Sequence, residues 1–187
     1  RSLKALGKTV RTYHSWDDFD TFRKVPANLP QQELLTKHLR EPICVVPDPH
    51  GKYENYAEAG CKAFEHELEQ VGMHPEFIYQ HKKYQNGDYA DSMRTALQNT
   101  KRITDILNQY RTDPLDASWL PTSIYCSKCK KVETTNEKYD GNWGYSYECV
   151  HCGNKETVDI REAKYLKLNW RTDWPMRWAY EKVDFEP

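Results

Sequence analysis

Residues 125–131 read YCSKCKK and residues 148–154 read ECVHCGN. They form two Cys-x2-Cys pairs, Cys126 with Cys129 and Cys149 with Cys152, separated by nineteen residues. This spacing is typical of a zinc ribbon, in which two hairpin ends each supply two thiolates to one tetrahedral ion. Because such a module is too small to build its own core, we expect structural zinc to decide its fold. A pair of disulfides is the alternative.

The residues around these cysteines refine the prediction. Four thiolates complete the shell of the ion, so no open position for water is expected and the zinc is not catalytic. His151 lies inside the second pair and is expected to be exposed rather than a ligand. Lys128, Lys130 and Lys131 crowd the first pair, either as phosphate contacts or as a solvated rim.

Short β-strands are predicted around the ribbon. Residues 122–160 are rich in Tyr, Val and Thr and contain the turn sequence DGNWG. Further strands are expected at Val10–Trp16 and in EFIY, residues 76–79.

Two amphipathic helices are expected upstream of the ribbon. Apolar residues recur at helical spacing from about Tyr53 to Val71, and again from a cap at Asp88 to Tyr110. Cys61 lies on the first apolar stripe, so we interpret it as a core residue rather than a reactive thiol.

The stretch LNWRTDWPMRW, residues 168–178, follows an alternating segment. Alternation over residues 165–172 predicts a strand that includes Trp170, with Pro175 in the first turn of the following helix. On this interpretation Trp170, Trp174 and Trp178 serve three different surfaces. Arg177 is expected to pair with Asp173.

The overall composition excludes several classes of protein. The 187 residues are 38% hydrophobic and 29% charged with a net charge of −1, unlike a disordered tail or a polybasic nucleic-acid clamp. No apolar run approaches the roughly 20 residues of a membrane span, and no secretory signal is evident. Paired cysteines without an export signal predict a cytoplasmic protein. The opening RSLKALG resembles the end of a helix, so a piece of a longer protein is expected.

Three long stretches carry a family resemblance. They are WDDFDTFRKVP at 16–26, VPDPHGKYENYAEAGCKAFE at 46–65 and LKLNWRTDWPMRWAYEKVDFEP at 166–187. From roughly residue 8 to residue 187 the chain resembles class I lysyl-tRNA synthetase, the Rossmann-based form of the lysine enzyme. The resemblance implies an enzyme that activates lysine with ATP and transfers it to tRNA-Lys. The HIGH-like and KMSKS-like motifs of that family are absent from these residues, so the segment alone is expected to be inactive.

The resemblance also implies an α/β organisation. Residues 1–52 would belong to a Rossmann-type catalytic fold, 53–121 to a helical connective region, 122–162 to the zinc ribbon and 163–187 to a strand and helix returning to the catalytic fold. The expected partners are tRNA-Lys, lysine and ATP, with no membrane and with a monomeric enzyme.

A site for lysine needs an apolar wall for the stem and a π face or a carboxylate for the ammonium group. By resemblance, Trp170 in the LNW position lines the lysine pocket. Trp174 and Trp178 are further candidates, with packing as the alternative role.

Two consecutive acids follow the strand at 10–16. Asp17 and Asp18 are predicted to neutralise the α-ammonium group or to order nearby loops, the alternative being a helix cap with a solvated neighbour. Arg23 and Lys24 either approach phosphate or the tRNA end, or are ordinary surface charges. We expect Ser15–Asp18 and Asn169–Trp174 to meet as neighbouring strands of one sheet.

Three other functions remain open. A non-catalytic zinc-ribbon module that binds tRNA is disfavoured by the near-neutral charge. A class I synthetase for an acidic amino acid would need arginines in the pocket. A zinc-stabilised interaction domain would leave the three long stretches unexplained.

Overall fold

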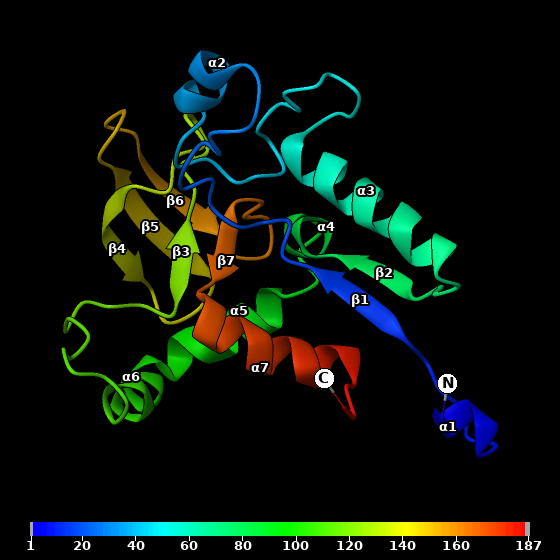
Figure 1. Ribbon diagram of the computed structural model, residues 1–187. Helices are drawn as coiled ribbons and strands as arrows, with labels where there is room; N and C mark the ends of the chain where they lie inside the picture. The colour runs from blue at the N-terminus through cyan, green and yellow to red at the C-terminus, as the bar shows by residue number, and fades with distance from the viewer. Residues whose placement is uncertain (1, 186–187) are drawn as a thin grey trace. The chain divides into compact units, whose positions relative to one another are not determined.

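A computed structural model describes residues 2–185 and divides the chain into two compact units, one up to Lys82 and one from Lys83 (Figure 1). The elements of the first unit are α1 (Ser2–Ala5), β1 (Tyr13–Trp16), α2 (Gln32–Lys37), α3 (Tyr56–Gln70) and β2 (Glu76–Tyr79). Helix α4 (Gln80–Gln85) contains the boundary.

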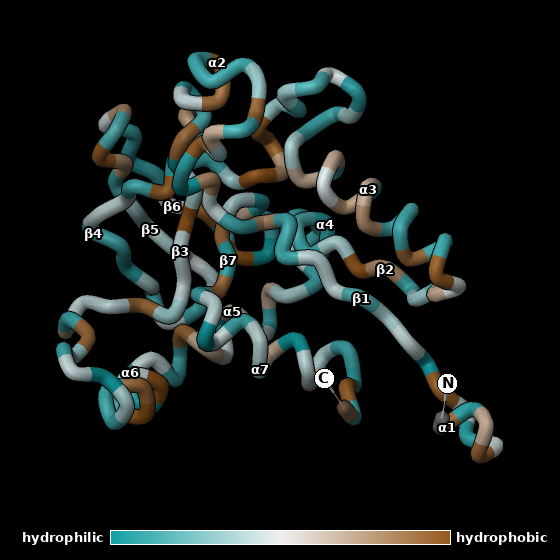
Figure 2. The backbone as a smooth tube through the Cα atoms, in the orientation of Figure 1, coloured by the Kyte–Doolittle hydropathy of each residue, from teal (hydrophilic) through white to brown (hydrophobic). Residues whose placement is uncertain are grey.

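The first unit is built on a β–α–β arrangement. Strands β1 and β2 are parallel, with Tyr13 opposite Glu76 and Trp16 opposite Tyr79, and α3 lies between them in sequence. The two strands differ in hydropathy, β1 being pale and β2 brown in Figure 2. Both strands were predicted, and both are confirmed with shorter bounds for β1.

Helix α3 is held on the strands by its own side chains. Glu65 accepts hydrogen bonds from the Trp16 indole at 3.2 Å, the Tyr79 hydroxyl at 2.5 Å and the Lys62 ammonium group at 2.8 Å. The Phe64 ring lies 5.5 Å from the Trp16 ring, edge to face. These contacts join the helix to both strands, so the parallel pair and α3 form one packed layer.

The predicted helix near residues 53–71 is confirmed as α3. The Asn55 side chain caps it by accepting the Glu58 N–H at 2.9 Å. The predicted stripe is buried only in its first half, because Ala57 and Cys61 are buried whereas Phe64 is 40% exposed. Burial raises the pKa of the Cys61 thiol to about 12, which confirms a core residue rather than a reactive one.

A small hydrophobic core is formed by the segment between β1 and α3. It consists of buried Phe22, Leu35 and Val46, with partly buried neighbours packed against them. These neighbours are Val25, Leu29, Leu39, Ile43 and Tyr56. A long irregular segment is thereby fixed in place by side-chain packing.

The elements of the second unit, within the described residues, are helices and short strands. They are α5 (Ala90–Gln98), α6 (Thr100–Asn108), β3 (Thr122–Ile124), β4 (Thr134–Tyr139), β5 (Gly144–Cys149), β6 (Lys155–Asp159), β7 (Leu166–Leu168) and α7 (Trp170–Glu181). Strands β4, β5 and β6 form an antiparallel sheet, and β3 pairs antiparallel with β7. The predicted short strands and the DGNWG turn between β4 and β5 are therefore confirmed.

The single helix predicted from Asp88 to Tyr110 is wrong in two respects. It is broken at Asn99, whose side-chain amide donates to the Thr95 carbonyl at 2.8 Å and so competes with the helical hydrogen bonds. Asp88 is not the cap, because Tyr89 occupies that position and the Asp88 carboxylate instead binds the Lys83 ammonium group at 2.9 Å.

The strand predicted over residues 165–172 is too long. Strand β7 ends at Leu168 and α7 already begins at Trp170, so Trp170 belongs to the helix and not to the strand. The Asn169 side chain explains this boundary, because its amide donates to the carbonyls of Leu120 and Thr122 and fixes the junction. Pro175 consequently lies inside the helix and not in its first turn.

The expectation that Ser15–Asp18 and Asn169–Trp174 form neighbouring strands is also wrong. Strand β1 is hydrogen-bonded to β2, and β7 to β3, in separate sheets. Most of the second segment is helical.

No helix among residues 2–185 is long and apolar enough to cross a bilayer.

Replacing each of two glycines by alanine should change the free energy of unfolding in opposite directions. Gly87 has a φ of +78°, and a Cβ there would lie 2.7 Å from the Arg161 carbonyl oxygen, whereas Gly60 sits in α3 with open space around it. We expect Gly87→Ala to lower the free energy of unfolding by about 1–3 kcal/mol. Gly60→Ala should raise it by about 0.5–1 kcal/mol. Urea denaturation measures both, and equal effects would contradict the structure.

Candidate functional site

The four cysteines of the two Cys-x2-Cys pairs converge on one point. Their sulfur atoms all lie within 4.8 Å of one another, with 3.7 Å between Cys126 and Cys152 and 3.6 Å between Cys129 and Cys149. Tetrahedral zinc with Zn–S bonds of about 2.3 Å requires sulfur separations of about 3.8 Å. The cluster therefore has the dimensions of a zinc site with four cysteine ligands.

The two cysteine pairs adopt the same local turn. The Lys130 N–H donates to the Cys126 carbonyl at 2.8 Å, and the Gly153 N–H donates to the Cys149 carbonyl at 2.9 Å. Lys130 and Gly153, each directly after the second cysteine of its pair, have φ values of 63° and 70°. This repeated geometry presents two sulfur atoms from each turn.

Polar groups around the Cys126 sulfur favour its thiolate form, whereas burial raises the pKa of Cys129 to about 12 and also raises the pKa of Cys149. Burial opposes ionisation of Cys126, but the backbone N–H groups of Cys129 and Lys128 outweigh it and lower the pKa of this thiol to about 7. The Asn154 amide lies 3.7 Å from the Cys126 sulfur. His151 is exposed and outside the cluster, as predicted.

The lysines beside the first pair have different surroundings. The Lys130 ammonium group lies 4.0 Å from the centre of the Tyr165 ring and donates to the Ser127 carbonyl, so it contributes to the packing of the turn. Lys128 is exposed.

Removing one thiolate should release the metal. We expect Cys152→Ser to abolish stoichiometric zinc and to melt the ribbon at residues 122–160. Cys44→Ser, a cysteine outside the cluster, should retain one zinc per chain. Zinc content by atomic emission and local stability by hydrogen exchange measure the two effects. Equal zinc in both variants would refute the four-cysteine site.

The three tryptophans lie together on α7. Trp170, Trp174 and Trp178 are spaced by four residues and so follow one face of the helix. Trp170 is 58% exposed and Trp178 is 48% exposed, and the rings of Trp170 and Trp174 meet edge to face at 5.9 Å. The prediction that each ring serves a different surface is therefore wrong.

The neighbouring face of α7 carries charges and is buried. Asp173 is 1% exposed, Arg177 5% and Glu181 9%. Arg177 donates to Asp173, which confirms the predicted ion pair, and the buried Tyr84 hydroxyl also donates to Asp173. Burial is the main cause that raises the pKa of Tyr84 well above its usual value.

Helix α7 thus inverts the usual amphipathic pattern, because its charged stripe is buried while Trp170 and Trp178 of its aromatic stripe are exposed. The helix is pale to teal along its length in Figure 2, without a run of aliphatic residues. Buried charges are tolerated only when they are paired and hydrogen-bonded. The network fixes the helix and leaves the Trp170 ring exposed.

Trp174 contains an unsatisfied polar atom. Its Nε1 is buried and has no hydrogen-bond partner within residues 2–185. Leaving a buried donor unpaired costs about 1–3 kcal/mol. The Nε atoms of Arg94 and Arg177 are buried in the same way, so this feature does not set Trp174 apart as a ligand contact.

The predicted acids lie in the first unit, at the end of β1. The Asp18 carboxylate is 3% exposed and accepts the backbone N–H of His81 at 2.8 Å and its Nδ1 at 2.5 Å. This matches the helix-cap alternative for Asp18, since His81 lies in the first turn of α4. Asp17 is half-buried and is the first residue after β1.

Sequence reasoning missed His81 and Tyr84. Each binds a partner far away in the chain, 63 residues for His81 with Asp18 and 89 residues for Tyr84 with Asp173. Neither pair has a local spacing signal. Only the fold brings them together.

The chain belongs to the family described as tRNA synthetases class I (K), whose profile matches residues 1–187. A protein named lysine–tRNA ligase from Borrelia garinii is 51% identical over the whole chain, which covers 36% of that relative. Similar proteins of the same name occur in Treponema pallidum, at 44% identity and 36% coverage, and in Thermococcus kodakarensis, at 45% identity and 35% coverage. The chain spans about a third of the length of these relatives.

Proposed function

We propose that the chain forms part of a lysine–tRNA ligase, which activates lysine with ATP and transfers the lysyl group to tRNA-Lys. The observation that carries this proposal is the match of all 187 residues to one family, with relatives of 51% and 44% identity that carry this name. ATP and tRNA are partners of the whole protein. A monomeric, cytoplasmic enzyme is part of the same proposal.

We also propose a Rossmann-type origin for the first 52 residues and a connective role for 53–121 and 122–162. The parallel pair of β1 and β2 around α3 supports a Rossmann-type origin, because β–α–β units build doubly wound folds. Since α3 and β2 lie between residues 56 and 79, this support extends the Rossmann-type part past residue 52, and the connective role would begin after β2. The convergence of the four cysteine sulfurs supports zinc in the ribbon. Bound zinc would cross-link the two cysteine turns and supply no step of the reaction.

Lysine recognition is assigned to the aromatic face of α7. Trp170 offers an open ring for the stem and ammonium group of lysine, and a cation over such a ring contributes about 0.5–2 kcal/mol depending on desolvation. Trp174 adds a second ring to this face, in edge-to-face contact with Trp170 at 5.9 Å. Trp178 continues the same face. Asp17 remains a predicted partner of the α-ammonium group, as does Asp18 despite its bonds to His81.

Replacing the first ring should separate lysine binding from ATP binding. In the full-length protein we expect Trp170→Ala to raise the KM for lysine about tenfold, because the cation loses its π face, with the KM for ATP nearly unchanged. Pyrophosphate exchange at saturating tRNA measures both constants. Tyr110→Ala, which removes another exposed ring, is the control. Equal rises in both constants would make Trp170 structural.

The 187 residues alone should not activate lysine, since they contain neither a HIGH-like nor a KMSKS-like motif. We expect pyrophosphate exchange by the isolated chain to stay at background, with or without tRNA. Exchange above background would contradict this. Tight tRNA binding by the isolated chain, with a steep salt dependence, would favour the alternative of a non-catalytic tRNA-binding module.

A further inference from the structure

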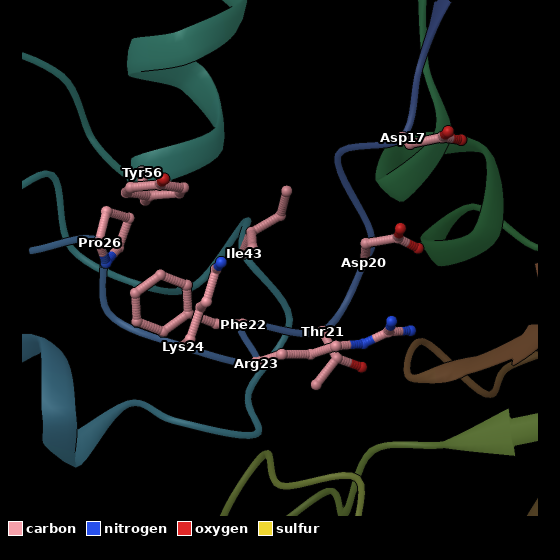
Figure 3. Close-up of a pocket in the computed structure, with 9 residues that line it drawn as sticks. All are labelled: Asp17, Asp20, Thr21, Phe22, Arg23, Lys24, Pro26, Ile43 and Tyr56. Atoms are coloured by element: carbon pink, nitrogen blue, oxygen red, sulfur yellow. The ribbon is translucent and has the colours of Figure 1, made fainter.

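A groove in the first unit has Asp17 at its edge, and its other lining residues have no role in the function proposed above. It is formed by the loop after β1 together with Ile43 and Tyr56, the first residue of α3 (Figure 3). Its volume is about 360 Å³. Pockets for small ligands span roughly 300–1,000 Å³, so this groove has room for one small planar molecule and its substituents.

One wall of the groove is a fixed aromatic surface. The Tyr56 ring lies 5.2 Å from the Phe22 ring, and Phe22 is 3% exposed within the core cluster described above. The Tyr56 backbone N–H donates to the Val46 carbonyl at 2.7 Å. Figure 3 shows Pro26 beside the Tyr56 ring. A ring held in this way is a platform on which a flat base stacks.

Two cations stand on the rim of the groove. Arg23 and Lys24 are both exposed, and neither forms an ion pair or a side-chain hydrogen bond with any other residue in the range 2–185. Proteins that bind single-stranded nucleic acids combine aromatic rings with nearby cations, so that bases stack on the rings and phosphates bind the cations.

The carboxylates of the groove offer hydrogen-bond acceptors beside the two cations. Asp17 and Asp20 lie on the side opposite Tyr56, and Arg23 extends toward Asp20 (Figure 3). A phosphate held by Arg23 therefore keeps its neighbouring ribose within reach of Asp20, whose oxygens accept hydrogen bonds. A ribose 2′-hydroxyl is the donor that distinguishes RNA from DNA.

We propose that this groove binds one nucleotide of a single-stranded RNA end. Its base stacks on Tyr56, its phosphate binds Arg23 and Lys24, and its ribose hydroxyl donates to Asp20. The identification of this RNA as the unpaired 3′ segment of tRNA rests on the proposed function. Free ATP fits less well, because the open rim offers two monovalent cations rather than a cradle for three phosphates. An acidic peptide would leave the flat ring without a matching partner.

The test separates tRNA binding from the chemistry of lysine and ATP. In the full-length protein, Tyr56→Leu and the double variant Arg23→Ala/Lys24→Ala are expected to raise the KM for tRNA about tenfold each. The KM values for lysine and ATP, measured at saturating tRNA, should not change. The double variant should also weaken the salt dependence of the KM for tRNA, whereas Tyr56→Leu should leave it as it is.

Matched controls lie nearby in the same unit. Tyr53→Leu removes a ring outside the groove, and Lys8→Ala removes an exposed cation, so both should behave as the unmodified protein. An unchanged KM for tRNA in the double variant would overturn the proposal, since these exposed side chains can be removed without disturbing the core. A rise in the KM for ATP instead would assign the groove to the free nucleotide.

Failure of the proposed function remains distinguishable from failure of this inference. If the unmodified protein attaches no lysine to tRNA, the proposed function is wrong. The groove is then tested by direct binding of a short single-stranded RNA and of DNA with the same sequence. Tighter binding of RNA that is lost in the double variant supports the site. Equal binding of RNA and DNA, or no effect of the variants, overturns it.

Discussion

The buried pair of Asp173 and Arg177, completed by the Tyr84 hydroxyl, is the interaction on which the second unit depends. Breaking one partner of such a buried pair typically costs about 3–5 kcal/mol, because the other charge stays buried without compensation. The Tyr84 hydroxyl also accepts the Leu168 N–H at 3.2 Å, so one side chain joins the end of β7 to the first turns of α7. The position of every tryptophan on α7 follows from this junction.

The network explains how large aromatic rings stay exposed on a helix. A helix normally gains stability by burying its apolar stripe. In α7 the attachment to the core is made by charged and hydrogen-bonded groups, so the aromatic stripe need not be buried to hold the helix. Binding surfaces require this separation, because a ring that stabilises the fold is not available to a ligand.

The ribbon and the first unit are both too small to build a large hydrophobic core, and each is stabilised in a different way. In the ribbon, four cysteine sulfurs within 4.8 Å bring two turns to one point, where the zinc that we propose would contribute stability that packing cannot supply. The first unit instead uses packing, with the cluster of Phe22, Leu35 and Val46 fixing a segment that has little regular structure. That cluster backs Tyr56, and it thereby shapes the groove that we assign to RNA.

The sequence alone determined the features that depend on local spacing. Two Cys-x2-Cys pairs predicted the thiol cluster, helical periodicity predicted α3, and a separation of four residues predicted the pair of Asp173 and Arg177. The helix and the ion pair were predictable because one helix brings the interacting groups together. The thiol cluster was predictable because each Cys-x2-Cys turn sets its own two sulfurs and the separation of the two turns is typical of a zinc ribbon. Tertiary structure decided the rest. The Asn169 side chain donates to the carbonyls of residues 120 and 122 and so ends the strand early. The Asp18 carboxylate binds His81, which lies 63 residues away in the sequence. Contacts across such distances leave no periodic trace in a sequence, because their partners are chosen by packing.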